Sequence, residues 1–182
     1  MTHADATIPP PTPRSASARL SDAIDALATL LAYVSGASFF VLSLYITYDA
    51  LARHYGLPYS GISDEISSYV LGIGGTWGMA FGLRAGAHVR IDLVISHVGP
   101  ALRRGLDVLA GAATMVFAAL LAFYSWTQAA EALALDTRSI TVLRAPLAIP
   151  QGLIAFGYTL LAIQAASMFV RGVAPGIGGD RI

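Results

Sequence analysis

Four stretches of the chain contain no charged side chain, and they constrain the fold more than any other feature. They are Ala26–Tyr48, Ile66–Leu83, Val108–Ala130 and Ala145–Val170. Because the hydrocarbon core of a bilayer is about 30 Å thick, a helix needs about 20 apolar residues to cross it. The sequence therefore predicts an all-α integral membrane protein with four transmembrane helices. Their expected bounds are about 26–48, 66–84, 107–130 and 147–170.

The composition agrees with lipid as the solvent. Hydrophobic residues make up 55% of the 182 residues and charged residues 12%, against about 25% charged in soluble domains. A soluble domain of this length could not bury so much apolar surface. The chain has no cysteine, and its eleven basic residues are balanced by eleven acidic ones. These numbers exclude a disulfide-stapled domain, zinc–thiolate chemistry and attraction to nucleic acid.

Two flanking segments are predicted to lack stable structure. Residues 1–20 contain four prolines between positions 9 and 13, and residues 172–182 contain Pro175 and several glycines. Proline and glycine both disfavour helix. We expect both segments to be flexible cytoplasmic tails around a membrane domain at 21–171.

The arginines predict how this domain is oriented. An even number of crossings places both termini and the connection between the second and third helices on one side. Eight of the eleven arginines lie on that side: Arg14, Arg19, Arg84, Arg90, Arg103, Arg104, Arg171 and Arg181. The positive-inside rule then places both termini in the cytoplasm.

The connection after the second helix predicts a short amphipathic helix at about 91–105. Apolar residues fall on one arc of its helical wheel: Ile91, Val94, Ile95, Val98 and Leu102. Such a helix lies in the membrane interface. The alternative is that this stretch is the frayed start of the third transmembrane helix.

Glycines give the second helix its strongest pattern. Gly74, Gly78 and Gly82 share one face, and small residues let another helix approach closely. The approaching helix could be the chain's own first helix, where small residues stand at Ser35, Gly36 and Ser38, or it could belong to a partner.

Charged residues stand at both ends of the same helix. Asp64 and Glu65 open it, where acidic side chains suit the positive end of the helix dipole. A second group of charged residues follows its last turn: Arg84, His88, Arg90 and Asp92. We expect this group to tie the helix end to the interfacial helix or to a partner, with a solvated loop as the alternative.

The four uncharged runs contain no histidine either, so no Asp, Glu, Lys, Arg or His lies inside them. An ionisable residue at mid-membrane normally marks an ion or substrate path, and a haem would need axial ligands inside the bundle. The sequence therefore favours neither a self-sufficient ion-coupled transporter nor a haem subunit. No nucleophile–base pair is visible either, so we expect no enzyme, no cofactor, no metal site and no substrate site. Three glutamines lie in or near the last two spans and are expected to bond to a neighbouring helix rather than to line a substrate path: Gln128, Gln151 and Gln164.

Together these segments resemble the small membrane subunit of tripartite ATP-independent periplasmic (TRAP) transporters, the DctQ-like small permease. The resemblance runs from about Ile24 to Arg171. It rests on the acidic pair Asp64–Glu65 before a glycine-rich helix and on Leu83–Asp92 after it, which is similar to the family's arginine–histidine–aspartate signature. Ile149–Gly152 at the start of the fourth helix also fits.

The resemblance implies a role in the bacterial inner membrane and no chemistry of its own. In such transporters a large permease subunit holds the substrate and sodium sites, and a periplasmic binding protein delivers the substrate, typically an organic acid. The small subunit is then a scaffold for the large subunit that helps to dock the binding protein. The alternative is a non-catalytic anchor or assembly subunit of another inner-membrane complex.

Overall fold

The computed structural model describes residues 16–85, 99–141 and 143–173, and these residues form four helices and no extended sheet. The helices are α1 (Ala16–Tyr55), α2 (Ser63–Arg84), α4 (Pro100–Ala134) and α5 (Ala148–Val173). A single antiparallel bridge, between Arg138 and Pro146, lies in the connection between α4 and α5.

Three of these helices are long and apolar enough to cross a membrane. The qualifying segments are Ser21–Tyr55, Val108–Ala134 and Ala148–Val170. The predicted crossing at 66–84 is not among them. α2 has 22 residues, but it begins with a serine and two acidic residues and carries several glycines, which add little hydropathy.

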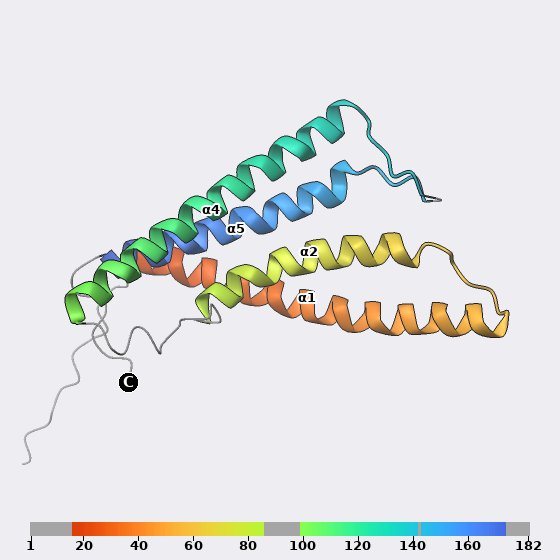
Figure 1. Ribbon diagram of the computed structural model, residues 1–182, viewed down its shortest axis with the longest axis horizontal. Helices are drawn as coiled ribbons and strands as arrows, with labels where there is room; N and C mark the ends of the chain where they lie inside the picture. Colours follow the sequence, from red (N-terminus) through yellow and green to blue (C-terminus); the bar gives the residue numbers. More distant parts are fainter. Residues whose placement is uncertain (1–15, 86–98, 142, 174–182) are drawn as a thin grey trace, which may run out of the picture.

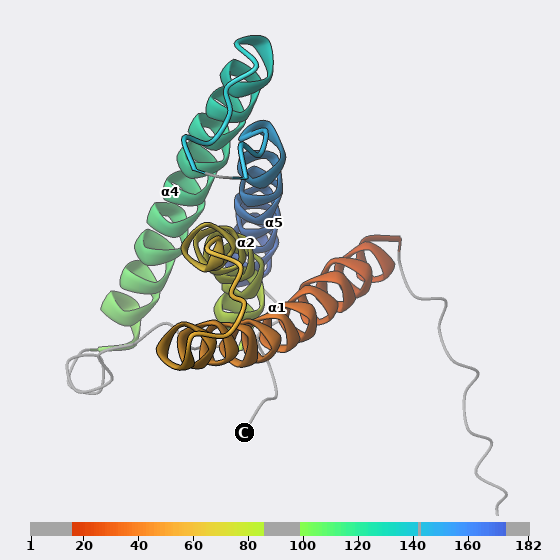
Figure 2. The same cartoon turned by 90° about the vertical axis from the view of Figure 1, so that its right-hand side faces the viewer.

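The helices form two hairpins that meet along α2 and α5 (Figure 1). α1 packs on α2, α2 packs on α5, and α5 packs on α4, with a smaller contact between α1 and α5. Figure 2 shows α2 and α5 in the middle, with α1 and α4 on the outer sides. We call the end that carries the α1–α2 and α4–α5 connections the loop end, and the opposite end the terminal end.

Small side chains fill the contacts between helices. The buried cluster contains Ala28, Leu31, Ala80 and Leu160, with Trp77 packed against it. Large apolar side chains are instead exposed along the outer helices, as Phe40 and Phe117 are at 67% and 63%. This distribution suits a chain whose outer surface meets lipid, because packing rather than the hydrophobic effect joins helices in a bilayer.

Two indole N–H groups also link neighbouring helices. Trp77 Nε1 donates to the carbonyl oxygen of Leu153 at 3.0 Å, which joins α2 to α5. Trp126 Nε1 donates to Thr159 Oγ1 at 2.9 Å, which joins α4 to α5.

Two helices extend into the segments that were expected to be tails. α1 begins at Ala16 rather than after residue 20, because the last proline of the leader is Pro13 and good helix formers follow it. α5 continues to Val173 and includes Gly172. Both helices therefore extend beyond the apolar runs that predicted them.

The start of α4 also differs from the prediction. α4 begins at Pro100, which stands in its first turn, where proline's fixed φ and missing N–H are tolerated. Residues 100–105, expected in a separate interfacial helix, are instead the first turns of α4. The other part of that predicted helix, up to residue 98, lies outside the described residues.

Candidate functional site

A buried carboxylate, Asp49, organises the loop end of α1 and α2. It is 1% exposed and accepts four hydrogen bonds. The donors are the Ser60 N–H and hydroxyl, each at 3.0 Å, Ser63 Oγ at 2.9 Å and Arg53 Nη2 at 2.8 Å. Hydrogen bonds to a charged acceptor are stronger than neutral ones. Asp49 therefore fixes the α1–α2 connection against the last turns of α1 and the first residue of α2.

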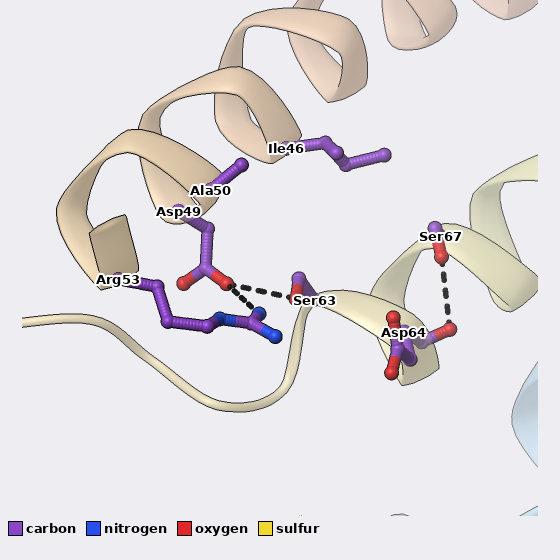
Figure 3. A pocket seen from close by; sticks show the side chains of 7 residues that line it. All are labelled: Ile46, Asp49, Ala50, Arg53, Ser63, Asp64 and Ser67. Carbon is purple, nitrogen blue, oxygen red and sulfur yellow. Dashed lines mark hydrogen bonds and ion pairs between the residues drawn. The ribbon is translucent and has the colours of Figure 1, made fainter.

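A cavity of about 250 Å³ opens beside this carboxylate (Figure 3). Its lining comes from both helices: Ile46, Asp49, Ala50, Arg53, Ser63, Asp64 and Ser67. Asp64 is exposed, and within the described part of the chain no side chain bonds to its carboxylate; Ser67 donates instead to its backbone oxygen at 2.9 Å. The cavity thus has both polar and apolar lining, and its two carboxylates differ: Asp49 is fully bonded, whereas Asp64 is open.

Ser63 does not cap the N-terminus of α2, although serine is a common N-cap residue. Ser63 is the first residue of the helix and donates its hydroxyl to Asp49. The cap position is held by Ile62, which has no side-chain hydrogen bond to the helix.

Glu65 connects α2 to the other hairpin. It is 6% exposed and accepts hydrogen bonds from the Thr141 hydroxyl, in the α4–α5 connection, and from Tyr69 Oη at 2.7 Å. The Thr141 bond, followed by the Tyr69 bond, holds the pKa of Glu65 below its usual value. Glu65 is therefore an internal tie between the two hairpins.

A third polar cluster joins three helices at the terminal end. Arg84 Nε lies 3.5 Å from Asp25 Oδ2, and Arg84 Nη1 donates to Thr29 Oγ1 at 3.1 Å. Gln164, which is 1% exposed, donates its Nε2 to Asp25 Oδ1 at 3.0 Å. The expectation that Gln164 bonds to a neighbouring helix is confirmed, and Asp25 is the shared acceptor for α2 and α5.

The glycines of α2 differ from one another in their surroundings. A Cβ on Gly74 would lie 2.7 Å from Cε1 of Phe39, so here α2 touches α1 closely. A Cβ on Gly78 or Gly82 would meet no heavy atom within 4 Å. Of these three glycines, only Gly74 therefore shows contact with the chain's own first helix, and its neighbour there is the ring of Phe39 rather than the small residues Ser35 and Gly36.

A second close approach of α2 to another helix involves a glycine that sequence reasoning missed. A Cβ on Gly157 of α5 would lie 2.6 Å from Thr76 Oγ1. Gly157 stands alone in an apolar run, and no pattern of small residues on α5 pointed to it.

Three predicted residues lie outside the part of the chain that the structure describes: His88, Arg90 and Asp92. Within residues 16–85, 99–141 and 143–173, no group of three or more histidine, aspartate and glutamate side chains could hold a metal ion.

Comparison with known proteins identifies a family. A family model described as "Tripartite ATP-independent periplasmic transporters, DctQ component" matches residues 42–174. The matched region includes the second part of α1 and all of α2, α4 and α5. It also includes the polar clusters around Asp49 and Glu65, and the third cluster without Asp25 and Thr29. No curated protein and no solved structure matched the chain.

Proposed function

The chain belongs to the DctQ component family of tripartite ATP-independent periplasmic transporters, and from this premise we propose that it scaffolds a large permease subunit in the bacterial inner membrane. It is an integral membrane protein with long apolar helices. The family match over residues 42–174 is the observation that carries the proposal.

The placement of charge supports a scaffold rather than a transport path. Charged side chains of the described helices lie near helix ends, where Asp49 and Asp25 each bond to neighbours in the same chain. A scaffold needs no ionisable relay at mid-membrane. Substrate and sodium sites then belong to the large subunit, and a periplasmic binding protein supplies the organic acid.

The proposed topology has four crossings, with both termini in the cytoplasm and the loop end in the periplasm. α2, with 22 residues, would be about 33 Å long at 1.5 Å per residue, which is enough for a core of about 30 Å. The arginine distribution supports the orientation. An amphipathic segment before Pro100, in the interface, completes the proposed membrane domain.

Two surfaces are proposed for contact with the large subunit. On α2, Gly78 and Gly82 have open space where a Cβ would stand, so a partner helix could approach its backbone. In the cytoplasm, the segment after Arg84 offers His88, Arg90 and Asp92. Glu65 and Gly74 are engaged within the chain and are not part of these surfaces.

Copurification tests the proposal. The chain, tagged at its C-terminus, would be extracted in mild detergent from cells that also express a large TRAP permease subunit. We expect the large subunit to copurify with it. Recovery of a different membrane complex without the permease would instead favour the alternative role of an anchor or assembly subunit.

Substitutions can then locate the contact. Replacing His88→Ala or Asp92→Ala should reduce copurification without preventing membrane insertion, while Asp136→Asn in the opposite connection serves as the control. Unchanged copurification and uptake in both variants would favour a solvated loop at this position.

Reporter fusions test the topology independently. An alkaline phosphatase fused within the α1–α2 connection should be active, because that connection is proposed to be periplasmic. The same enzyme fused at Ile182 should be inactive, and activity there would contradict the orientation.

A further inference from the structure

The outer face of α4 carries polar side chains that the fold of this chain leaves without a hydrogen bond. α4 packs on α5 and lies on an outer side of the bundle (Figure 2). Tyr124, Gln128 and Glu131 are all exposed, and their spacing of four and then three residues places them on one face of the helix. We call these three residues the α4 polar stripe.

The stripe differs from the other polar side chains nearby in having no internal partner. Thr127 is also exposed, but its hydroxyl donates to the carbonyl oxygen of Phe123 at 2.7 Å. Within the described part of the chain, nothing bonds to the hydroxyl of Tyr124, the amide of Gln128 or the carboxylate of Glu131. The expected bond from Gln128 to a neighbouring helix is therefore not made among these residues.

The contact between α4 and α5 shows how deep the stripe lies. Trp126, which stands between Tyr124 and Gln128, bonds to Thr159. Thr159 lies midway along the apolar span Ala148–Val170. At 1.5 Å per residue, Tyr124 and Gln128 are each displaced along α4 by only about 3 Å from Trp126. Both are therefore expected inside a hydrocarbon core of about 30 Å.

This depth restricts what can cover the stripe. Hydrocarbon offers no hydrogen-bond donor or acceptor, so an amide or hydroxyl that faces it stays unsatisfied. Polar side chains of membrane helices usually bond to another helix. A soluble protein does not reach this level of the bilayer. The neighbour that satisfies the stripe is therefore another membrane-spanning helix.

Charge separates a different subunit from a second copy of this chain. Two copies with the same orientation in one membrane pair about an axis along the membrane normal, which brings equivalent residues to the same level. Glu131 would then face its own counterpart, and like charges at short distance repel. A different membrane protein can instead place a cation or a donor beside this carboxylate.

We propose that the α4 polar stripe is a contact surface for a membrane helix of the large permease subunit. That helix bonds to Tyr124 and Gln128 inside the hydrocarbon core and offers a cation or a hydrogen-bond donor to Glu131, nearer the loop end. The inference rests on the proposed function, because it requires the two membrane subunits to associate. It adds a third surface to the open glycines of α2 and the segment after Arg84.

Two substitutions remove polar groups of the stripe with little change in size. Tyr124→Phe and Gln128→Leu should each weaken association of the purified subunits in detergent by about threefold to thirtyfold, the equivalent of one hydrogen bond between membrane helices. The matched control is Thr127→Val, which removes a hydroxyl that is bonded within the chain. It should leave the association unchanged.

The isolated subunit provides the second readout. Its melting temperature should not fall in Tyr124→Phe or Gln128→Leu, because neither polar group has a bond within the chain. A fall in that temperature would mean that the stripe serves the fold of this chain. Unchanged association in both stripe variants would equally overturn the inference.

Photocrosslinking identifies the neighbour of the stripe. A benzophenone amino acid would be placed at position 128, or at position 123 as the control, in the complex of this chain with the large subunit. Phe123 is 66% exposed but lies about 140° around the helix from Gln128. We expect a product with the large subunit from position 128 and none from position 123.

The other products of this experiment would overturn the inference. A product of this chain with itself from position 128 would make the neighbour a second copy, and the absence of any protein product would leave the stripe facing lipid. Copurification of the wild-type chain is measured in the same preparations. If the large subunit is missing there, the proposed function fails as well, whereas a large subunit that copurifies without crosslinking to position 128 contradicts this inference alone.

Discussion

Gly157→Ala should destabilise the protein because α2 and α5 are in contact at this position. The new Cβ would lie 2.6 Å from Thr76 Oγ1, 2.8 Å from Thr76 Cβ and 2.9 Å from Trp77 Cδ1. Thr76 cannot easily retreat: it is 5% exposed, and its hydroxyl bonds back to its own helix at 2.9 and 3.0 Å. Trp77 is held by its bond to the Leu153 carbonyl. The two helices must therefore move apart.

A matched variant isolates the cost of that movement. Gly152 lies in the same helix, and a Cβ added there would meet no heavy atom within 4 Å. Replacing either glycine by alanine gains helix propensity of about 0.8–1.0 kcal/mol, which cancels in the comparison. The remaining difference is the overpacking term, about 1–3 kcal/mol.

Thermal unfolding of the purified protein in mild detergent measures this difference. At about 2–4 °C per kcal/mol for a chain of this size, Gly157→Ala should melt about 2–12 °C below Gly152→Ala. Trp77 lies at the contact, so its fluorescence reports on the same site. Equal melting temperatures for the two variants would refute the close approach of α2 and α5.

The other contacts of α2 lead to two further predictions. Gly74→Leu should lower the melting temperature of the isolated subunit, because the new leucine would collide with Phe39. Gly78→Leu should leave that temperature unchanged and reduce copurification with the large subunit. Equal melting temperatures for the two variants would contradict the assignment of these two faces. The bonds from Thr141 and Tyr69 lower the pKa of Glu65 from its ordinary value of 4.5. These bonds therefore stabilise the folded state fully above pH 4.5, and this stabilisation is lost as the pH falls through the lower pKa that Glu65 has in the folded state. Melting curves over this acidic range should therefore lose less stability in Glu65→Gln than in the wild type, and parallel losses would contradict a stabilising role for the carboxylate.

Within the described residues, the uncharged runs predicted where the four long helices lie and their order along the chain. Runs such as Val108–Ala130 lie inside helices because a polar or irregular backbone cannot face lipid. Their ends were underestimated: α1 extends to Tyr55 and α4 begins at Pro100. A helix need not stop where the hydrocarbon core stops, so charge marks the limits of the apolar span and not those of the helix.

The candidate site was predicted less completely, because its contacts join residues that are distant in sequence. Glu65 was identified, but its partner Thr141 lies 76 residues away, and no local pattern connects them. Asp49 marked the end of an apolar run, yet no motif indicated that Ser60 and Ser63 would fold back onto it. Such contacts depend on loop conformation rather than on helical periodicity.

The glycine face shows a second limit of sequence reasoning. A helical wheel places Gly74, Gly78 and Gly82 together but does not say which neighbour each one meets. Of these three glycines, only Gly74 is covered by α1 in the structure. The tilt of one helix across another decides how far along a face the contact extends.

Reconstituted uptake tests the central claim most directly, namely that this chain is a required subunit of a TRAP transporter and does not transport by itself. Proteoliposomes would contain the large permease subunit alone, this chain alone, or both, and each would receive a sodium gradient and binding protein loaded with a labelled organic acid. We expect uptake only when both membrane subunits are present. Uptake by this chain alone, or full uptake by the large subunit without it, would contradict the account.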